Sequence, residues 1–188
     1  MRIDYAGVAP QPLRLLREME RYLERCGLDP FLVELVRLRA SQLDGCGYCV
    51  DVHARTLRNR GETVQRLMAI PSWRDTDLFS DREKAALWWA EAVTRVSQSR
   101  VPDEVYRRAR EWFSEKELAD LTFAVVAANS WARLWVASRR EIGVGAAWRG
   151  MREAAPRRRR PTARFAGAGS SHPEAGLTST TEDQEIAH

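Results

Sequence analysis

Apolar residues recur along most of the chain at the three- and four-residue spacing of an amphipathic α-helix. After an arm over residues 1–12, the first apolar stripe runs from Leu13 to Leu23 and ends at Gly27. No segment sustains the strict alternation of apolar and polar residues that is typical of a strand. The pattern predicts an all-α protein, a compact bundle of six or seven helices. The expected helices span about residues 13–27, 30–43, 46–61, 62–69, 81–96, 102–113 and 115–140.

Capping signals support the boundaries of the later helices. Ser80 with Glu83, and Ser114 with Glu117, have the spacing of a capping box, in which each side chain bonds the backbone amide of the other residue. We therefore expect long helices to begin after Ser80 and after Ser114. Trp73 lies in the loop before the first of them, where a tryptophan is most often a core anchor.

A helical hairpin is expected at the centre of the sequence. Asp29 is a good N-cap, and Pro30 suits the first helical position because its missing amide would be unpaired there anyway. Asp44 and Gly45 then supply a turn, with Asp44 placed to cap the second helix. Gly61 is the expected C′ glycine of that helix.

Four chemically active side chains fall within this hairpin. Cys46 and His53 are seven residues apart on the second helix, and Cys49 lies one turn before His53, so all three share one face. At 1.5 Å per residue, Glu34 and His53 lie ~15 and ~12 Å from the turn. If the two arms pack antiparallel, the carboxylate of Glu34 faces the imidazole of His53.

These residues are suited to thiol redox chemistry. A helix N-terminus lowers the pKa of a cysteine thiol, and Cys46 and Cys49 lie in the first turns of their helix. The two cysteines are close enough for a disulfide, so one thiol can resolve a sulfenic acid that forms on the other. His53 can carry a proton between the thiols and solvent, with Glu34 either orienting the ring or serving as the base.

Two other interpretations fit the same cysteines. A structural zinc site uses this spacing, but it needs about four ligands, and there is no second cysteine pair. The remaining candidates, Cys26, His172 and His188, lie outside the hairpin. The cysteines can also be small buried apolar residues beside a hydrogen-bonded histidine.

The whole pattern resembles a known family. The segment ELVRLRASQLDGCGYCVDVHARTLRNRGE (34–62) is similar to the alkylhydroperoxidase D-like group of the carboxymuconolactone decarboxylase superfamily, which consists of small all-helical proteins. DREKAALWWAEAVTRV (81–96) and AANSWARLWVASR (127–139) support the resemblance. It implies that Cys49 is the attacking thiol, Cys46 the resolving thiol, Glu34 the base and His53 the proton relay.

Two positions depart from the family pattern. Well-studied members carry a second histidine where this chain has Tyr48, so a relay here has one imidazole fewer. Many relatives have asparagine where this chain has Asp44, which places a negative charge near Cys46. We expect both differences to affect the rate more than the type of reaction.

Charge and composition exclude several classes of protein. The chain has 188 residues and a formal net charge of +4, and its basic residues are nearly all arginines. Through residue 150 the arginines alternate with glutamates, as in RLLREMERYLER, which is typical of solvated helix faces and not of a nucleic-acid-binding surface. We find no apolar run long enough for a membrane span and no signal-peptide pattern, and therefore expect a cytoplasmic protein.

The composition changes near residue 149. From there the chain is rich in Arg, Gly, Ser and Thr, and poor in large apolar residues. Such a segment cannot bury enough apolar surface to offset the entropy of ordering it. We expect a single helical domain over residues 1–148 and a disordered tail over residues 149–188.

These observations predict a thiol-dependent hydroperoxidase or disulfide reductase with a role in antioxidant defence. The expected partners are a hydroperoxide substrate and an external dithiol, and the resemblance implies a lipoyl-type reductant and a homo-oligomer, a trimer or hexamer. No cofactor, metal, nucleic acid or membrane is implied. Two alternatives stay open: a lactone decarboxylase, whose relatives generally lack the cysteine pair, and a non-enzymatic redox sensor.

Overall fold

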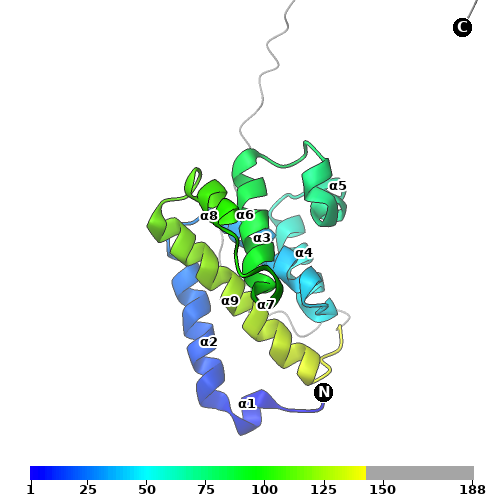
Figure 1. Cartoon of the computed structure of the whole chain (residues 1–188). Helices are drawn as coiled ribbons and strands as arrows, with labels where there is room; N and C mark the ends of the chain where they lie inside the picture. Colours follow the sequence, from blue (N-terminus) through cyan, green and yellow to red (C-terminus); the bar gives the residue numbers. More distant parts are fainter. Residues whose placement is uncertain (143–188) are drawn as a thin grey trace, which may run out of the picture. The chain divides into compact units, whose positions relative to one another are not determined.

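A computed structural model of the chain describes residues 1–142, which form nine α-helices and one 3₁₀-helix, with no strand among them (Figure 1). Two of the nine, α1 and α7, are single turns of four residues, and the other seven correspond to the expected helices. The all-α prediction is therefore confirmed. The elements are α1 (Tyr5–Val8), α2 (Pro10–Leu23), α3 (Pro30–Leu43), α4 (Gly47–Asn59), α5 (Val64–Ala69), η1 (Ile70–Asp75), α6 (Asp81–Thr94), α7 (Val96–Ser99), α8 (Asp103–Arg110) and α9 (Glu115–Ala137).

Helix α3 lies at the centre of the core. It packs against α4, α6 and α9, and most of its residues are buried, including the fully buried Leu35 and Val36. A helix surrounded on all sides needs apolar residues all round and not a single stripe, which is the composition of this segment. Its buried charged residues, Glu34 and Arg37, are paired with each other. The centre of the fold therefore contains an ion pair as well as apolar side chains.

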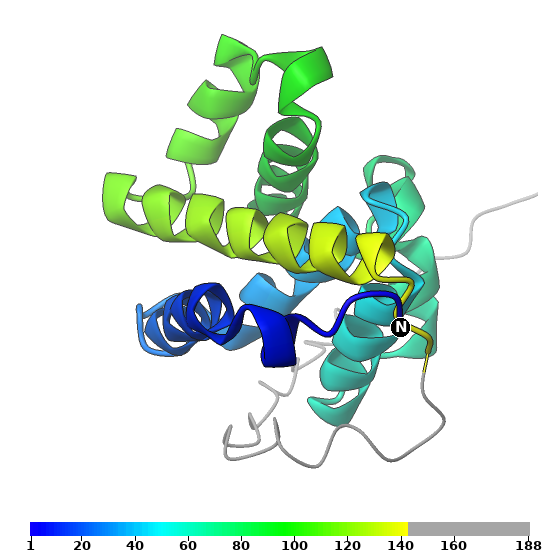
Figure 2. The same cartoon turned by 90° about the horizontal axis from the view of Figure 1, so that it is seen from below.

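Helix α9 joins the remaining elements to this centre. It is the longest helix, and it lies beside α2 on one side and α6 on the other (Figures 1 and 2). The buried face of α9 includes Leu121, Ala124, Val125 and Ala128, and its small alanines allow close approach of neighbouring helices. The capping boxes predicted at Ser80 and Ser114 are both present, at the starts of α6 and α9.

The turn of the central hairpin differs from the expectation in one respect. Asp44 was expected to cap the second helix, but it is the C-cap of α3. The N-cap of α4 is Cys46, whose Sγ accepts a hydrogen bond from the amide of Cys49 at 3.2 Å. Gly45 lies between the two caps at φ = 67° and completes the turn, so the capping position falls after the glycine and not before it.

Three other boundaries are corrected. The N-terminal arm contains helix α1, and α2 begins at Pro10, because proline fits the first turn of a helix. Helix α2 ends at Leu23, four residues before Gly27. Helix α8 ends at Arg110, and Trp112 and Phe113 lie beyond it. The predicted domain boundary at residue 148 and the predicted disorder of the tail lie outside the described residues.

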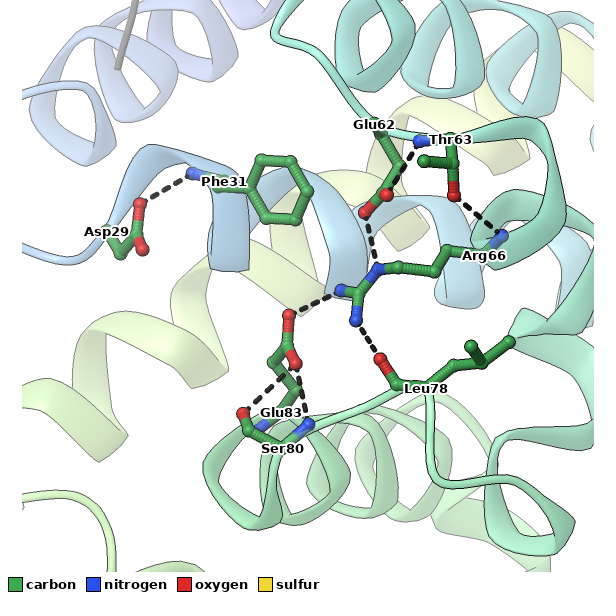
Figure 3. Close-up of polar contacts among 8 residues, drawn as sticks. All are labelled: Asp29, Phe31, Glu62, Thr63, Arg66, Leu78, Ser80 and Glu83. Atoms are coloured by element: carbon green, nitrogen blue, oxygen red, sulfur yellow. Dashed lines mark hydrogen bonds and ion pairs between the residues drawn. The ribbon is translucent and has the colours of Figure 1, made fainter. Parts of the chain in front are cut away.

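The loop after α4 is held against the start of α6 by Arg66 (Figure 3). Its Nε donates to Glu62 at 3.0 Å, and its Nη2 donates to Glu83 at 2.6 Å. Nη1 donates to the backbone oxygen of Leu78. Because Glu83 also completes the capping box with Ser80, a single guanidinium fixes α5 and the first turn of α6 together.

The tryptophan expected in a loop lies in the 3₁₀-helix η1 instead, and it is a core anchor, as predicted. Trp73 is 4% exposed, and its indole Nε1 donates to Glu91 on α6 at 3.0 Å. Arg39 on α3 and Arg74 pair with the same carboxylate.

Among the described residues, no helix combines the length and the apolar composition that a membrane span requires.

Candidate redox-active site

The antiparallel packing of α3 and α4 brings Glu34 and His53 into contact. The Nδ1 atom of His53 lies 2.9 Å from Oε2 of Glu34. Glu34 is 6% exposed, and the His53 side chain is also largely buried. The contact expected from the two distances to the turn is therefore confirmed.

Arg37 holds the other oxygen of the same carboxylate. Its Nη1 donates to Oε1 of Glu34 at 2.8 Å, and its Nη2 donates to Oε2 of Glu20 on α2. Glu20 also accepts a hydrogen bond at 3.0 Å from the indole of Trp131 on α9. One network of hydrogen bonds and ion pairs thus connects His53 on α4 to residues of α3, α2 and α9.

This network controls the charge of Glu34. Burial alone would raise the pKa of its carboxyl, but the charges and hydrogen bonds of His53 and Arg37 outweigh burial and lower the pKa from 4.5 to about 2. Burial would likewise lower the pKa of Arg37, and its carboxylate partners raise it instead. Because an ionised carboxylate can only accept hydrogen bonds, Nδ1 of His53 carries the proton, and in the neutral ring Nε2 is the atom free to accept one.

Cys46 and Cys49 form a disulfide at the N-terminus of α4. Their Cα atoms are 5.3 Å apart, and the two residues are only 2% and 4% exposed. Cys46 is the N-cap, and the amide of Cys49 points at its sulfur. Oriented backbone amides at a helix N-terminus stabilise a thiolate, so this position favours ionisation of the reduced cysteines.

Aromatic residues cover the disulfide. The cysteines pack against Ala132 of α9, with Tyr48 and Trp135 on the same cluster. Tyr48 meets Trp135 edge-on, at 5.8 Å between ring centroids. Trp135 in turn stacks on Trp131 at 5.4 Å. Tyr48, which replaces the second histidine of the family pattern, is therefore part of an apolar wall beside the sulfurs.

The negative charge expected from Asp44 is partly countered. Oδ2 of Asp44 lies 3.6 Å from Nη1 of Arg133 on α9. Burial raises the pKa of Asp44, and the charge of Arg133 opposes that rise. The effect of Asp44 on a neighbouring thiolate is therefore smaller than the sequence suggests.

The geometry offers no metal site among residues 1–142, where no three or more His, Cys, Asp or Glu side chains are grouped around a common point. Cys26, the other cysteine, lies three residues after the end of α2 and donates to the backbone oxygen of Leu23.

The structure thus joins the four predicted residues in two separate pairs on the same hairpin, Glu34 with His53 and Cys46 with Cys49. Their catalytic roles stay predictions. Sequence reasoning missed Arg37, Glu20 and the place of Trp135 beside the disulfide. A basic residue three positions after Glu34 is a recognisable sign of an ion pair on a helix, and it is the one signal that was available.

The fold and the site define a class of protein: an all-helical protein with a disulfide-bonded CxxC pair at a helix N-terminus and a Glu–His pair on the same hairpin. The carboxymuconolactone decarboxylase family model matches residues 10–92, and the chain belongs to this family. Its fold is that of the AhpD-like members.

Two close relatives support the assignment. The uncharacterized protein YdfG of Bacillus subtilis (strain 168) is 37% identical over 136 residues, which cover 72% of this chain and 92% of YdfG. ATU0492 from Agrobacterium tumefaciens is a protein of unknown function described as a candidate AhpD antioxidant defence protein. Its sequence is 33% identical to this chain, and its crystal structure matches the fold with a TM-score of 0.74. That match covers 77% of this chain and 99% of the other.

A shorter segment of the chain is similar in sequence to a named enzyme. The alkyl hydroperoxide reductase AhpD of Solibacter usitatus (strain Ellin6076) is 35% identical over 63 residues, which cover 34% of this chain and 33% of that protein.

Proposed function

We propose that the protein is a thiol-dependent hydroperoxidase that cycles between the Cys46–Cys49 disulfide and the reduced dithiol. The observation that carries this proposal is the placement of a buried CxxC disulfide at the start of α4, with the His53–Glu34 pair on the same hairpin. Membership of the carboxymuconolactone decarboxylase family and the likeness to AhpD proteins support it.

The proposed cycle starts from the reduced pair. The Cys49 thiolate attacks the terminal oxygen of a hydroperoxide, the O–O bond breaks, and the products are a Cys49 sulfenic acid and an alkoxide, which takes up a proton to become the alcohol. The Cys46 thiol then attacks the Cys49 sulfur and displaces water, which forms the disulfide. An external dithiol returns two electrons to the pair by thiol–disulfide exchange and becomes a disulfide itself. The same exchange step would give disulfide reductase activity.

His53 is the proposed proton carrier of this cycle. Its Nε2 accepts the proton from a thiol and delivers it to the departing oxygen. With a pKa near 2, the carboxylate of Glu34 is a weak base, so its proposed role is to fix the tautomer and orientation of the ring. This choice favours one of the two roles that the sequence left open.

Activity assays of three variants test the proposal. Reduced protein is mixed with an organic hydroperoxide, and peroxide loss and free thiols are followed with and without added dithiol. Cys49→Ser is expected to abolish turnover. Without added dithiol, Cys46→Ser is expected to stop after one equivalent of peroxide, with the sulfenic acid trapped. Cys26→Ser is the matched control and is expected to behave like the wild type.

The same assay separates the alternatives. Unchanged peroxide consumption in Cys49→Ser would refute the proposal. A slow stoichiometric reaction with a change in assembly would favour a redox sensor, and inert thiols with lactone decarboxylation would favour the activity that gives the family its name.

We further propose that the protein works as a cytoplasmic homo-oligomer, a trimer or hexamer. Exposed apolar residues on α9, Phe123 and Val126, are candidates for a subunit interface. Light scattering of the purified full chain tests this, and a monomer at all concentrations would contradict it.

A further inference from the structure

An arginine lies against the aromatic wall that covers the disulfide. The guanidinium carbon of Arg140 is 4.5 Å from the ring centroid of Tyr48 and 4.5 Å from that of Trp135. Both rings belong to the cluster that packs on Cys46 and Cys49. The proposed function gives this cation no task.

The chain after α9 is folded so that Arg140 stays in this place. Arg139 adopts a left-handed conformation at φ = 52°, and the amide of Arg140 donates back to the carbonyl oxygen of Trp135 at 2.9 Å. Two residues further on, the side chain of Ile142 lies against Gly47. A Cβ added to Gly47 would be 3.3 Å from Cδ1 of Ile142. The segment is thus turned back over the first turn of α4.

The charge of Arg140 is not neutralised within the described part of the chain. None of the ion pairs formed by residues 1–142 involves it. Its guanidinium makes one polar contact there, from Nη1 to the sulfur of Met1 at 4.0 Å, and a thioether is a weak acceptor. Asp44, the carboxylate beside the cysteines, is already paired with Arg133.

Contact with two rings, which are inclined at 69° to each other, positions the guanidinium for one kind of ligand. The cation–π contacts hold the charged group without using its N–H donors, which lie in the guanidinium plane. A carboxylate matches this fork and is bound by two parallel hydrogen bonds. The neighbouring Tyr48, Trp135 and Trp131 offer an apolar surface for the rest of the same molecule.

We infer that Arg140 is a specificity residue that binds the carboxylate of a molecule reacting with the Cys46–Cys49 pair. The molecule has an apolar body, which lies on the aromatic wall, and a carboxylate, which lies on Arg140. It is either the hydroperoxide that oxidises the pair or the dithiol that reduces it. The inference rests on the proposed thiol chemistry of the site and adds the class of substrate.

Two matched pairs of reagents distinguish these sources. The first pair is dihydrolipoate and dihydrolipoamide, which differ in a carboxylate and a neutral amide. Each dithiol attacks the protein disulfide, passes through a mixed disulfide and leaves as the cyclic disulfide, so two electrons reduce both cysteines. The second pair is a cumyl hydroperoxide with a para carboxylate and its methyl ester, each mixed with the reduced protein.

Single-turnover rates are measured for the full-length wild type, Arg140→Gln and Arg139→Gln. Arg139 is the matched control, because it is the exposed neighbour and its loss removes the same charge. In at least one pair, we expect the carboxylate reagent to react about threefold to tenfold faster with the wild type. This preference is expected to disappear in Arg140→Gln, persist in Arg139→Gln and weaken with added salt.

The pair of reagents that shows the preference identifies the source of the carboxylate. Equal ratios in the wild type and Arg140→Gln for both pairs would overturn the inference, as would an equal loss of preference in Arg139→Gln. The dithiol arm needs no peroxide, so a protein that reduces no peroxide still gives a result there. Circular dichroism and Arg140→Lys, which keeps the charge and loses the planar fork, separate recognition from a folding defect.

Discussion

The Nδ1 atom of His53 lies 2.9 Å from Oε2 of Glu34, although the two residues are nineteen positions apart on different helices. The contact fixes which ring nitrogen carries the proton, because the carboxylate is ionised and can only accept. It therefore connects the packing of α3 on α4 to the proton chemistry proposed for the thiols.

His53→Gln is expected to lower kcat/KM for hydroperoxide reduction by about 100-fold, because general acid–base catalysis by a positioned side chain is worth about that much or more. The pH dependence of the remaining activity should also flatten. Arg55→Gln, an exposed change on the same helix, is the control and should retain activity. A His53→Gln enzyme with the rate and pH profile of the wild type would rule out the relay.

Glu34 is expected to make the fold sensitive to acid. Its pKa in the folded protein is about 2, against an ordinary value of 4.5, so its contribution to stability is complete above pH 4.5 and is lost as the pH falls through about 2. The difference corresponds to about 3 kcal/mol. Denaturant unfolding of the wild type at several pH values in this range should show a steeper fall than the same series on Glu34→Gln. Parallel curves would contradict the assignment.

Arg37→Met is expected to destabilise the fold by about 3–5 kcal/mol, because it leaves the buried carboxylate of Glu34 and the partly buried carboxylate of Glu20 without their cation. Chemical denaturation at neutral pH measures the loss. Arg17→Met on the exposed face of α2 is the matched control, with an expected change of about 0.5 kcal/mol or less. A loss of that small size in Arg37→Met would mean that the network contributes little.

Arg66→Met is expected to cost about 2–3 kcal/mol, because the buried carboxylate of Glu62 and the carbonyl of Leu78 lose their donor. The polar partners of Arg66 are Glu62, Leu78 and Glu83 and include no residue of the proposed thiol site, so single-turnover oxidation of the folded variant should match the wild type. Arg58→Met, an exposed change on α4, is the control for stability. Equal unfolding midpoints for the two variants would show that Arg66 does not hold the loop.

The sequence was sufficient for much of the local structure. Helical spacing of apolar residues, together with caps, glycines and prolines, predicted the seven longer helices, and the serine and glutamate pairs at residues 80–83 and 114–117 predicted the starts of α6 and α9. These signals are local, because helix periodicity and capping depend on residues within a few positions of one another. The same locality explains the error at Asp44, since the conformation of Gly45 decided which residue became the cap.

The site was determined by the sequence only in part. The spacing of Cys46, Cys49 and His53 along one helix placed them on one face, and the distances to the turn placed Glu34 opposite His53. Only the tertiary structure brought Glu20 of α2 to the Glu34 network. It also placed Trp131 and Trp135 of α9, and Arg140 after that helix, near the disulfide. Such contacts depend on how distant segments pack, and no periodic pattern records that packing. The sequence by itself therefore determined the helices and the reactive residues, while the tertiary structure decided the charge of Glu34 and which groups surround the disulfide.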